Sequence, residues 1–293
     1  QEDSGGIRTI PTPEIIVDDS EDGLLGSGTF GKVRRGIWQQ GTCTKEVALK
    51  SLATLANPSV LQDHERAHAQ AELQKELDIH AGLDHPNVLK LYGATLTDEG
   101  IWDAMVLELM DATLHSLLPL PNFHQQVGAL SDVAKGLRYL HERHPPILHM
   151  DVKSKNILVR YRPAAGENQD AFSPCAKLAD LGIAQAMDTT LEGLCARGTN
   201  GYMAPEVEDE AEWTPAADWF SFGVLIIEVN SGVAPQPRTR FPGAGSAPRI
   251  PTSEVQRRKA DLSAMADKGL CALARACIRD KPADRAEGRV VLE

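Results

Sequence analysis

The stretch His149-Met150-Asp151-Val152-Lys153-Ser154-Lys155-Asn156 decides the fold. It places a carboxylate, a cation two residues later and an amide five residues later in one polar segment. Apolar residues flank this segment, Ile147-Leu148 before it and Ile157-Leu158-Val159 after it. The pattern predicts a loop that presents a base, a cation and a metal-ligating amide between two apolar anchors.

Downstream motifs continue the same chemistry. Asp180-Leu181-Gly182 begins 24 residues after Asn156 (180 − 156) and closes the run 176–180. A carboxylate on such a turn suits Mg²⁺, which takes oxygen ligands and keeps several waters. The remaining motifs follow in order: Met203-Ala204-Pro205-Glu206, Asp218-Trp219-Phe220-Ser221-Phe222-Gly223, and Arg285.

A glycine-rich stretch lies near the start of the chain. Leu25-Gly26-Ser27-Gly28-Thr29-Phe30-Gly31-Lys32-Val33 matches the pattern G-x-G-x-x-G-x-V. The pattern alone also fits an ordinary hairpin or a dinucleotide-binding fold, in which the third glycine opens a helix. Here Gly31 enters a β-type run and a second strand follows, which favours a hairpin. Glycines let the backbone N–H groups of such a loop approach phosphate oxygens.

Lys50 is the predicted cation beneath this loop. It ends Val47-Ala48-Leu49-Lys50, 19 residues after the last glycine (50 − 31), and can reach the α- and β-phosphates of a nucleotide. A buried ammonium requires a carboxylate partner. Glu76 is the best candidate, because it lies mid-helix beside Leu73 and Leu77, whereas Glu72 points to a different side. The alternative is that Glu76, like most single glutamates on a helix, lies on a face of the helix that is exposed to solvent.

The predicted elements divide the chain in two. Helical periodicity covers residues 63–83, 124–141 and 213–229. Short strands dominate the first third of the chain outside the first helix. This segregation predicts an α+β fold with a strand-rich lobe at 23–110 and a helix-rich lobe at 111–293, after a polar lead-in at 1–22.

Composition narrows the function further. The chain has 293 residues, and 30 Lys+Arg against 41 Asp+Glu give a net charge of −11. This acidic balance argues against nucleic-acid binding and against a polybasic membrane anchor. The longest apolar run, 222–227, is far shorter than the roughly 20 residues of a membrane helix. Five cysteines without a C-x-x-C pair favour a reduced setting, either the cytoplasm or the cytoplasmic side of a larger protein.

In this order and spacing, the motifs resemble the eukaryotic protein kinase domain over about residues 23–293. The resemblance implies a bilobal kinase fold that uses ATP and Mg²⁺ to phosphorylate a protein substrate. It implies that Asp151 accepts or orients the proton of the acceptor hydroxyl and that Lys153 steadies the γ-phosphate. Asn156 and Asp180 would hold Mg²⁺, and Lys50, held by Glu76, would contact the α- and β-phosphates.

The same resemblance implies a nucleotide-binding set. Its members are Leu25, Gly26, Ser27, Gly28, Thr29, Phe30, Gly31, Val33, Ala48, Lys50, Glu108, Met110 and Leu158, with Leu107 at the gatekeeper position. Glu206 and Arg285 would form a structural ion pair, and Asp218 would brace the catalytic loop. Lys153 and Gly198-Thr199 resemble serine/threonine kinases, in which the threonine hydroxyl bonds the catalytic Asp and Lys. The sequences of the catalytic loop and of residues 198–206 are most similar to the tyrosine-kinase-like branch of serine/threonine kinases.

Departures from the family pattern set further expectations. Met150 stands where the family usually has Arg, so a phosphate on the activation segment loses its usual partner. We therefore expect activity to depend less than usual on phosphorylation of Thr189 or Thr190. Leu181 replaces the usual Phe as an apolar equivalent. The spacing of 26 residues from Lys50 to Glu76 (76 − 50) is longer than is usual in the family and predicts an extended loop before the helix.

Three alternatives stay open. A pseudokinase scaffold would bind nucleotide without turnover, and a dual-specificity kinase would also accept tyrosine. A nucleotide-dependent dehydrogenase would need a helix after Gly31. Outside the motifs, His141 and His144 are expected as solvated residues at a helix end, and Cys195 as a bystander thiol.

Overall fold

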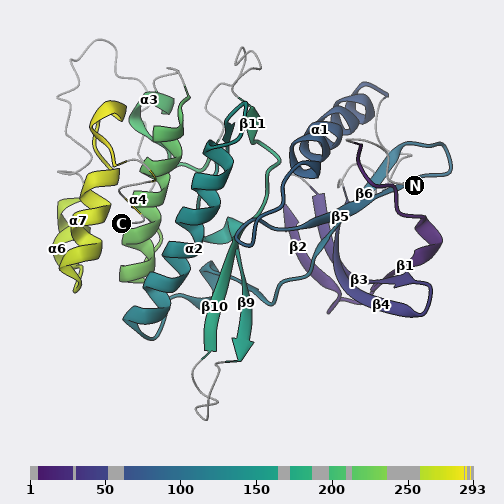
Figure 1. Cartoon of the computed structure of the whole chain (residues 1–293), viewed down its shortest axis with the longest axis horizontal. Helices are drawn as coiled ribbons and strands as arrows, with labels where there is room; N and C mark the ends of the chain where they lie inside the picture. The colour runs from purple at the N-terminus through teal and green to yellow at the C-terminus, as the bar shows by residue number, and fades with distance from the viewer. Residues whose placement is uncertain are drawn as a thin grey trace. The chain divides into compact units, whose positions relative to one another are not determined.

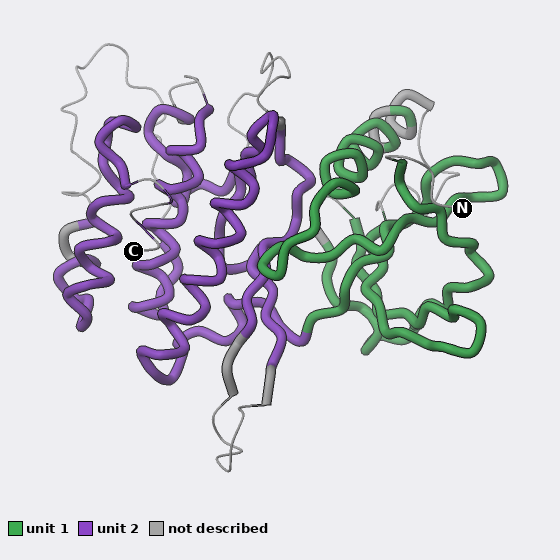
Figure 2. The backbone as a smooth tube through the Cα atoms, in the orientation of Figure 1, with its two compact units in different colours: residues 1–110 green, residues 111–293 purple. Residues whose placement is uncertain are grey.

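The computed structural model describes residues 6–28, 31–51, 63–163, 172–186, 198–208, 213–235 and 258–286, together with residues 288 and 291. The chain forms two compact units, Gln1–Met110 and Asp111–Glu293 (Figure 2). The first carries an antiparallel sheet and a helix, and the second is mostly helical (Figure 1). The predicted α+β class is therefore confirmed.

An antiparallel sheet forms the first unit. Its strands are β1 (Ile15–Val17), β2 (Leu24–Gly28), β3 (Gly31–Gln40), β4 (Cys43–Ser51), β5 (Leu91–Leu96) and β6 (Trp102–Glu108). Their order is β1-β3-β4-β6-β5, with β2 also paired to β3. The register aligns Val33 with Lys50 and Lys50 with Met105. Because side chains alternate along a strand, these three residues share one face of the sheet.

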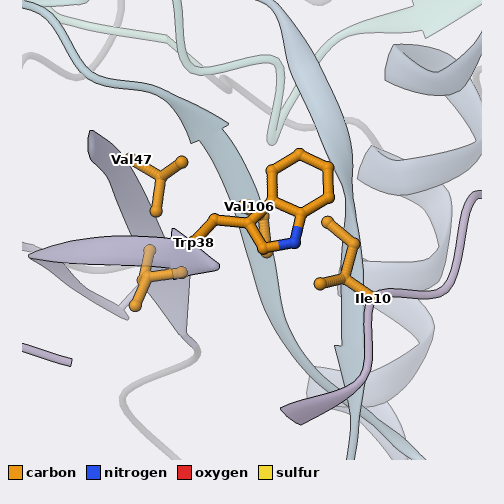
Figure 3. Close-up of a cluster of buried hydrophobic side chains, with 5 residues drawn as sticks. Ile10, Trp38, Val47 and Val106 are labelled. Carbon is orange, nitrogen blue, oxygen red and sulfur yellow. The ribbon is translucent and has the colours of Figure 1, made fainter. Parts of the chain in front are cut away.

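The opposite face of this sheet carries a hydrophobic core. Trp38, Val47, Leu49 and Val106 are buried there, and Ile10 packs against them (Figure 3). Ile10 lies outside any strand and is 1% exposed. Its amide donates to Ala94 O at 2.8 Å, which ties the N-terminal segment to β5. Part of the predicted polar lead-in therefore belongs to this core.

The N-terminal segment is also held in place after Ile10. It continues through the 3₁₀ turn Thr12–Glu14 into β1, which pairs with β3. Trp38 Nε1 donates to Glu14 Oε2 at 3.0 Å. A buried indole N–H needs such an acceptor, so Glu14 satisfies the one polar atom of the Trp38 side chain.

Helix α1 (Asp63–Ala81) corresponds to the first helix predicted from the sequence. Leu73, Leu77 and His80 are buried at the spacing i, i+4, i+7, which is one face of an α-helix. The His80 ring bonds Leu89 O through Nε2 at 2.6 Å. Burial lowers the pKa of His80 to about 4, so the ring is neutral at neutral pH.

The second unit is built around helix α4 (Pro215–Ser231). Residues 217–229 of this helix are all buried, and the helix packs against α2 (Phe123–His141), α6 (Lys259–Ala264) and α7 (Lys268–Cys277). It begins with Pro215 directly after Thr214, and Gly232, with φ +70°, follows its last residue as the C-cap. None of the helices in the described parts of the chain is long and apolar enough to cross a membrane.

Short strands and turns complete the second unit. These are β7 (Ala112–Thr113), η2 (His115–Leu117), β8 (Ile147–Leu148), η3 (Ser154–Asn156), β9 (Ile157–Pro163), β10 (Phe172–Leu178), β11 (Gln185–Ala186), α3 (Pro205–Glu208) and η4 (Pro282–Asp284). β9 pairs with β10 and with β7, and β8 pairs with β11. The apolar residues on both sides of the predicted catalytic loop are thus strands, and they fix both ends of it.

Candidate active site

The structure brings Lys50 and Glu76 together in the first unit. Lys50 Nζ lies 2.7 Å from Glu76 Oε1 and 2.9 Å from Oε2. The two side chains are 11% and 7% exposed. Because each charge is largely removed from water, each depends on the other for compensation. The pair thereby fixes the position of an ammonium group on the α1 side of the sheet.

The glycine-rich stretch forms the β2–β3 hairpin. Gly26 is the register partner of Val33, and Gly28 is the partner of Gly31. Gly31 has φ +129°, a backbone angle that residues other than glycine rarely adopt. Leu25 is exposed at an irregularity in this pairing, and Ser27 pairs with Lys32. Thr29 and Phe30 lie outside the described residues.

The other residues predicted to bind the nucleotide are distributed over both units. Ala48 and Leu107 are register partners on the face of the sheet that carries Lys50. Glu108 ends β6, and its amide donates to Lys90 O at 2.9 Å. Met110 is buried at the end of the first unit. Leu158 is half-buried on β9 of the second unit, where it pairs with Thr113 and Lys177.

Asp151 is surrounded by hydrogen-bond donors. Lys153 Nζ donates to Oδ2 at 2.6 Å, and Asn156 Nδ2 donates to the same oxygen at 2.8 Å. Thr199 Oγ1 donates to Oδ1 at 2.7 Å and accepts from Lys153 Nζ at 2.7 Å. A carboxylate offers about four lone-pair positions. Oδ2 therefore has both positions filled, whereas the described residues fill one position on Oδ1.

Asn156 lies at the base of the β9–β10 hairpin, opposite the residue that precedes Asp180. Ala179 N donates to Asn156 O at 2.9 Å, one residue before Asp180. The Asn156 amide nitrogen also donates to Asp151 O at 2.9 Å. Since the amide nitrogen is used by Asp151, the atom that Asn156 can offer a cation is its oxygen Oδ1. Oxygen is the ligand that Mg²⁺ requires.

Two residues of this region adopt the left-handed conformation although they are not glycines. Met150 has φ +67° and Asp180 has φ +62°. Such backbone costs of order 1–3 kcal/mol and persists only where the surroundings enforce it. At Met150 the surroundings are visible, because its amide donates to Asp218 Oδ1 at 2.8 Å.

Asp218 holds the catalytic loop from helix α4. Its Oδ2 accepts from His149 N at 2.8 Å and bonds His141 Nε2 at 2.8 Å. Burial raises the pKa of the Asp218 carboxyl, but the hydrogen bond and charge of His141 and the interactions with His149 outweigh it, so the net pKa is lowered. Asp218 is therefore a buried anion that orients two successive backbone amides.

His141 corrects an expectation from the sequence. Its side chain is 8% exposed and bonded to Asp218, and its ring contacts Trp219 edge-on at 5.7 Å. The sequence suggested a solvated residue because His141 ends a helix among polar neighbours. Its partner lies 77 residues away, which local sequence cannot reveal. His144 is exposed, as expected.

The predicted structural ion pair joins α3 to the end of the chain. Arg285 Nη2 donates to Glu206 Oε2 at 2.7 Å, and Nη1 contacts the other oxygen of the same carboxylate. Arg285 Nη1 also donates to Ala216 O at 3.0 Å. This bidentate geometry orients both side chains. Thr189, Thr190 and Cys195 lie outside the described residues.

A second buried carboxylate, Glu228, was not predicted. Its Oε1 accepts from Ser154 Oγ at 2.7 Å, and its Oε2 accepts from Tyr202 OH at 2.6 Å. Burial and the hydrogen bond to Glu228 raise the pKa of Tyr202, so its hydroxyl stays protonated. His115 Nδ1 lies 3.6 Å from Glu228 Oε1. In the sequence, Glu228 is only one polar residue in an apolar helix, a weak signal that sequence analysis passed over.

Comparisons with known proteins identify the family of this chain. Residues 20–292 match the family model described as the protein kinase domain. The chain is 32% identical over 234 residues to the proline-rich receptor-like protein kinase PERK12 of Arabidopsis thaliana, covering 78% of this chain and 29% of the relative. It is 34% identical over 239 residues to mitogen-activated protein kinase kinase kinase 10 of Xenopus laevis, covering 79% of this chain and 22% of the relative.

A further relative is the receptor protein-tyrosine kinase CEPR2 of Arabidopsis thaliana, 32% identical over 234 residues, covering 76% of this chain and 22% of the relative. The chain belongs to the protein kinase domain family. The comparisons confirm the family predicted from the sequence and agree with its tyrosine-kinase-like branch of serine/threonine type. Membership implies ATP and a protein substrate. The chain spans less than a third of the length of these relatives.

Proposed function

We propose that this chain is a protein serine/threonine kinase that transfers the γ-phosphoryl group of ATP to a hydroxyl of a protein substrate. The observation that carries the proposal is the hydrogen bonding of Asp151, whose Oδ2 is saturated by Lys153 and Asn156. Oδ1 accepts from Thr199, and the described residues leave a position on it for one further donor. That donor would be the acceptor hydroxyl.

In this mechanism Asp151 Oδ1 accepts or orients the hydroxyl proton while the hydroxyl oxygen attacks the γ-phosphorus in line. The bond from the γ-phosphorus to the β,γ-bridging oxygen breaks, and ADP leaves with that oxygen. Lys153 Nζ, 2.6 Å from Asp151, steadies the γ-phosphate with its positive charge. Lys50, held by Glu76, contacts the α- and β-phosphates, and the backbone of the β2–β3 hairpin covers them. The chemistry required is mostly positioning and charge neutralisation.

Mg²⁺ would be held by Asn156 and Asp180. Two features fit this role: the oxygen Oδ1 that Asn156 can offer, and the left-handed Asp180. The described residues contain no cluster of three His, Cys, Asp or Glu side chains able to hold a metal. Mg²⁺ at a phosphoryl-transfer site takes one or two protein oxygens and completes its shell with phosphate and water. When bound, the ion would neutralise charge on the transferring phosphate.

The proposed acceptor is serine or threonine. The support is Lys153, two residues after Asp151, together with its bond to Thr199 at 2.7 Å. In serine/threonine kinases, which this chain resembles, a threonine in this place bonds the catalytic Asp and Lys. A dual-specificity kinase would also phosphorylate tyrosine, and phosphoamino-acid analysis separates the two.

We also propose a cytoplasmic setting for this domain. The described cysteines are Cys43, Cys175, Cys271 and Cys277, and all four are free thiols. Burial raises the pKa of Cys277 to about 12, so this thiol stays protonated and unreactive. Free thiols in this number are typical of a reducing compartment.

The experiment is a phosphotransfer assay with radiolabelled ATP, Mg²⁺ and myelin basic protein, followed by phosphoamino-acid analysis. Wild type is expected to label serine or threonine, whereas Lys50→Met, Asp151→Asn and Asp180→Asn should each lose at least about 100-fold in rate. Matched controls are Lys90→Met and Asp84→Asn, which remove a surface ion pair of 3.2 Å. Both controls should keep the wild-type rate.

The outcomes separate the alternatives. Nucleotide binding without label transfer, in a folded protein, would support the pseudokinase scaffold. Label on tyrosine as well as serine or threonine would support dual specificity. Undiminished transfer by Asp151→Asn would contradict the proposed role of Asp151.

A further inference from the structure

Arg258 is a buried cation outside every predicted motif. It precedes helix α6 as its N-cap residue and is 3% exposed. Its Nη2 donates to the main-chain oxygen of Gly201, 57 residues earlier in the chain. Removing a guanidinium from water costs free energy unless good hydrogen bonds compensate it. The hydrogen bond to Gly201 contributes to this compensation.

The contact fixes one end of a single peptide group. The Gly201 carbonyl and the Tyr202 amide belong to the same rigid, planar unit. Arg258 donates to the oxygen of this unit, and the Tyr202 N–H of the same unit donates to Thr199 O at 3.0 Å. Gly201 has φ +98°, a conformation open to glycine, whose backbone is the least restrained of any residue. The Arg258 bond therefore restrains a peptide that its own sequence leaves free to rotate.

The other end of this chain of contacts is the proposed base. Thr199 offers its backbone oxygen to the Tyr202 amide and its hydroxyl to Asp151 Oδ1 at 2.7 Å. Arg258, the 201–202 peptide, Thr199 and Asp151 thus form one continuous series of hydrogen bonds. Rotation of the peptide would shift Thr199 and withdraw its hydroxyl from the carboxylate.

Arg258 is well placed to act as a fixed support. Leu262 N donates to Arg258 O at 2.9 Å, which makes Arg258 part of the first turn of α6. Leu262 is buried, and α6 packs against α4 and α7. From the α4 side, Ser221 Oγ donates to Tyr202 O at 2.9 Å. The turn around Tyr202 is therefore held from two helices.

We propose that Arg258 is a positioning residue for phosphoryl transfer: it fixes the 201–202 peptide and thereby keeps the Thr199 hydroxyl on Asp151. The inference rests on the proposed kinase function. The hydrogen-bonded route from Arg258 to Asp151 runs through the 201–202 peptide and the Thr199 hydroxyl, so the proposed effect of Arg258 passes through Thr199.

A double-mutant cycle tests this route. Arg258→Met keeps an apolar stem but removes every donor, and it should lower kcat about ten-fold with the KM for ATP changed less than about two-fold. Arg258→Lys, which can still donate to the carbonyl, should lose only about three-fold. In a Thr199→Ala background, Arg258→Met should cost less than about two-fold, because the hydroxyl that it positions is gone.

Leu262→Ala is the matched control. It removes buried methyl groups from the same helix without removing a donor to Gly201, so it should lower the melting temperature but keep kcat within about two-fold of wild type. Hydrogen exchange supplies a readout independent of turnover. The Tyr202 amide should exchange at least about ten-fold faster in Arg258→Met than in Leu262→Ala, because only the first releases the peptide.

Each outcome decides the proposal. Full activity of folded Arg258→Met would overturn it, as would losses that multiply with Thr199→Ala instead of overlapping. If Arg258→Met does not fold, the same cycle is run with Arg258→Lys, whose loss must also vanish in the Thr199→Ala background. If wild type transfers no phosphate, the proposed function fails, and unchanged exchange of the Tyr202 amide would overturn the positioning role separately.

Discussion

The hydroxyl of Thr199 lies 2.7 Å from Asp151 Oδ1 and 2.7 Å from Lys153 Nζ, so it links the proposed base to its neighbouring cation. One hydroxyl thus donates to the carboxylate and accepts from the ammonium. This geometry orders Asp151 before any substrate arrives, which is the form of preorganisation that lowers a transition-state barrier.

Substitutions at Thr199 should therefore separate the contribution of its hydroxyl to kcat from the contribution of its methyl group. Thr199→Ala is expected to lower kcat by about 10- to 100-fold, the effect of losing a hydrogen bond to a charged group. Thr199→Ser keeps the hydroxyl and should lose less than about five-fold. Steady-state kinetics with myelin basic protein measures both, and equal losses in the two variants would assign the effect to packing.

The activation segment is expected to be unusually independent of phosphorylation. Met150 is buried and its amide is bound to Asp218, and its thioether side chain offers a phosphate no cationic partner. We predict that Thr189→Ala/Thr190→Ala keeps at least about half of the wild-type kcat, and phosphatase treatment should have a similarly small effect. Loss of activity in the double variant would show that another cation docks the phosphate.

His80 should make stability depend on pH. Its pKa is about 4 in the folded protein and about 6.5 when unfolded. Between these values the unfolded state binds the additional proton, so stability is full above pH 6.5 and falls as the pH drops toward 4. The contribution lost between pH 7 and pH 5 is roughly 2 kcal/mol.

The test of this prediction is urea unfolding of wild type and His80→Gln at pH 7 and pH 5. Glutamine can still donate to Leu89 O but does not titrate. The variant should lose less stability than wild type over this interval. Equal pH dependence in the two proteins would show that other groups determine it.

Tyr202→Phe should destabilise the second unit. It removes the hydroxyl that donates to the buried Glu228 carboxylate at 2.6 Å, and a buried charge that loses a donor costs about 1.5–3 kcal/mol. Tyr161→Phe is the control, because Tyr161 is 40% exposed and should change stability by less than about 0.5 kcal/mol. Denaturant unfolding measures both, and similar values would contradict the role given to Glu228.

The sequence predicted the elements that carry a strong period or start signal. Helices α1, α2 and α4 lie within a few residues of the predicted ranges, because their apolar faces repeat at helical spacing and Pro86 and Thr214-Pro215 mark their limits. The strands flanking the glycines were also recognisable. Strand β1 was missed, since three residues beside acidic turns carry too short a pattern to read.

The residues of the candidate site likewise divide into those that a local motif reveals and those whose contacts join distant parts of the chain. Asp151, Lys153 and Asn156 lie in one local motif and could be named from their spacing. The contacts of Arg258 with Gly201 and of His141 with Asp218 join residues 57 and 77 positions apart. Such pairings depend on how helices pack against loops, which periodicity and composition do not encode.

The burial of Ile10 affects how this domain should be produced. Similarity to other kinases begins at residue 20, yet Ile10 and the Glu14 acceptor of Trp38 precede that border and complete a core. A gene fragment started at residue 20 would expose the Trp38 face to water and leave the β3 edge beside β1 unpaired, inviting aggregation. Recombinant expression should accordingly include residues 8–19, which complete this core although they precede the match to the family model.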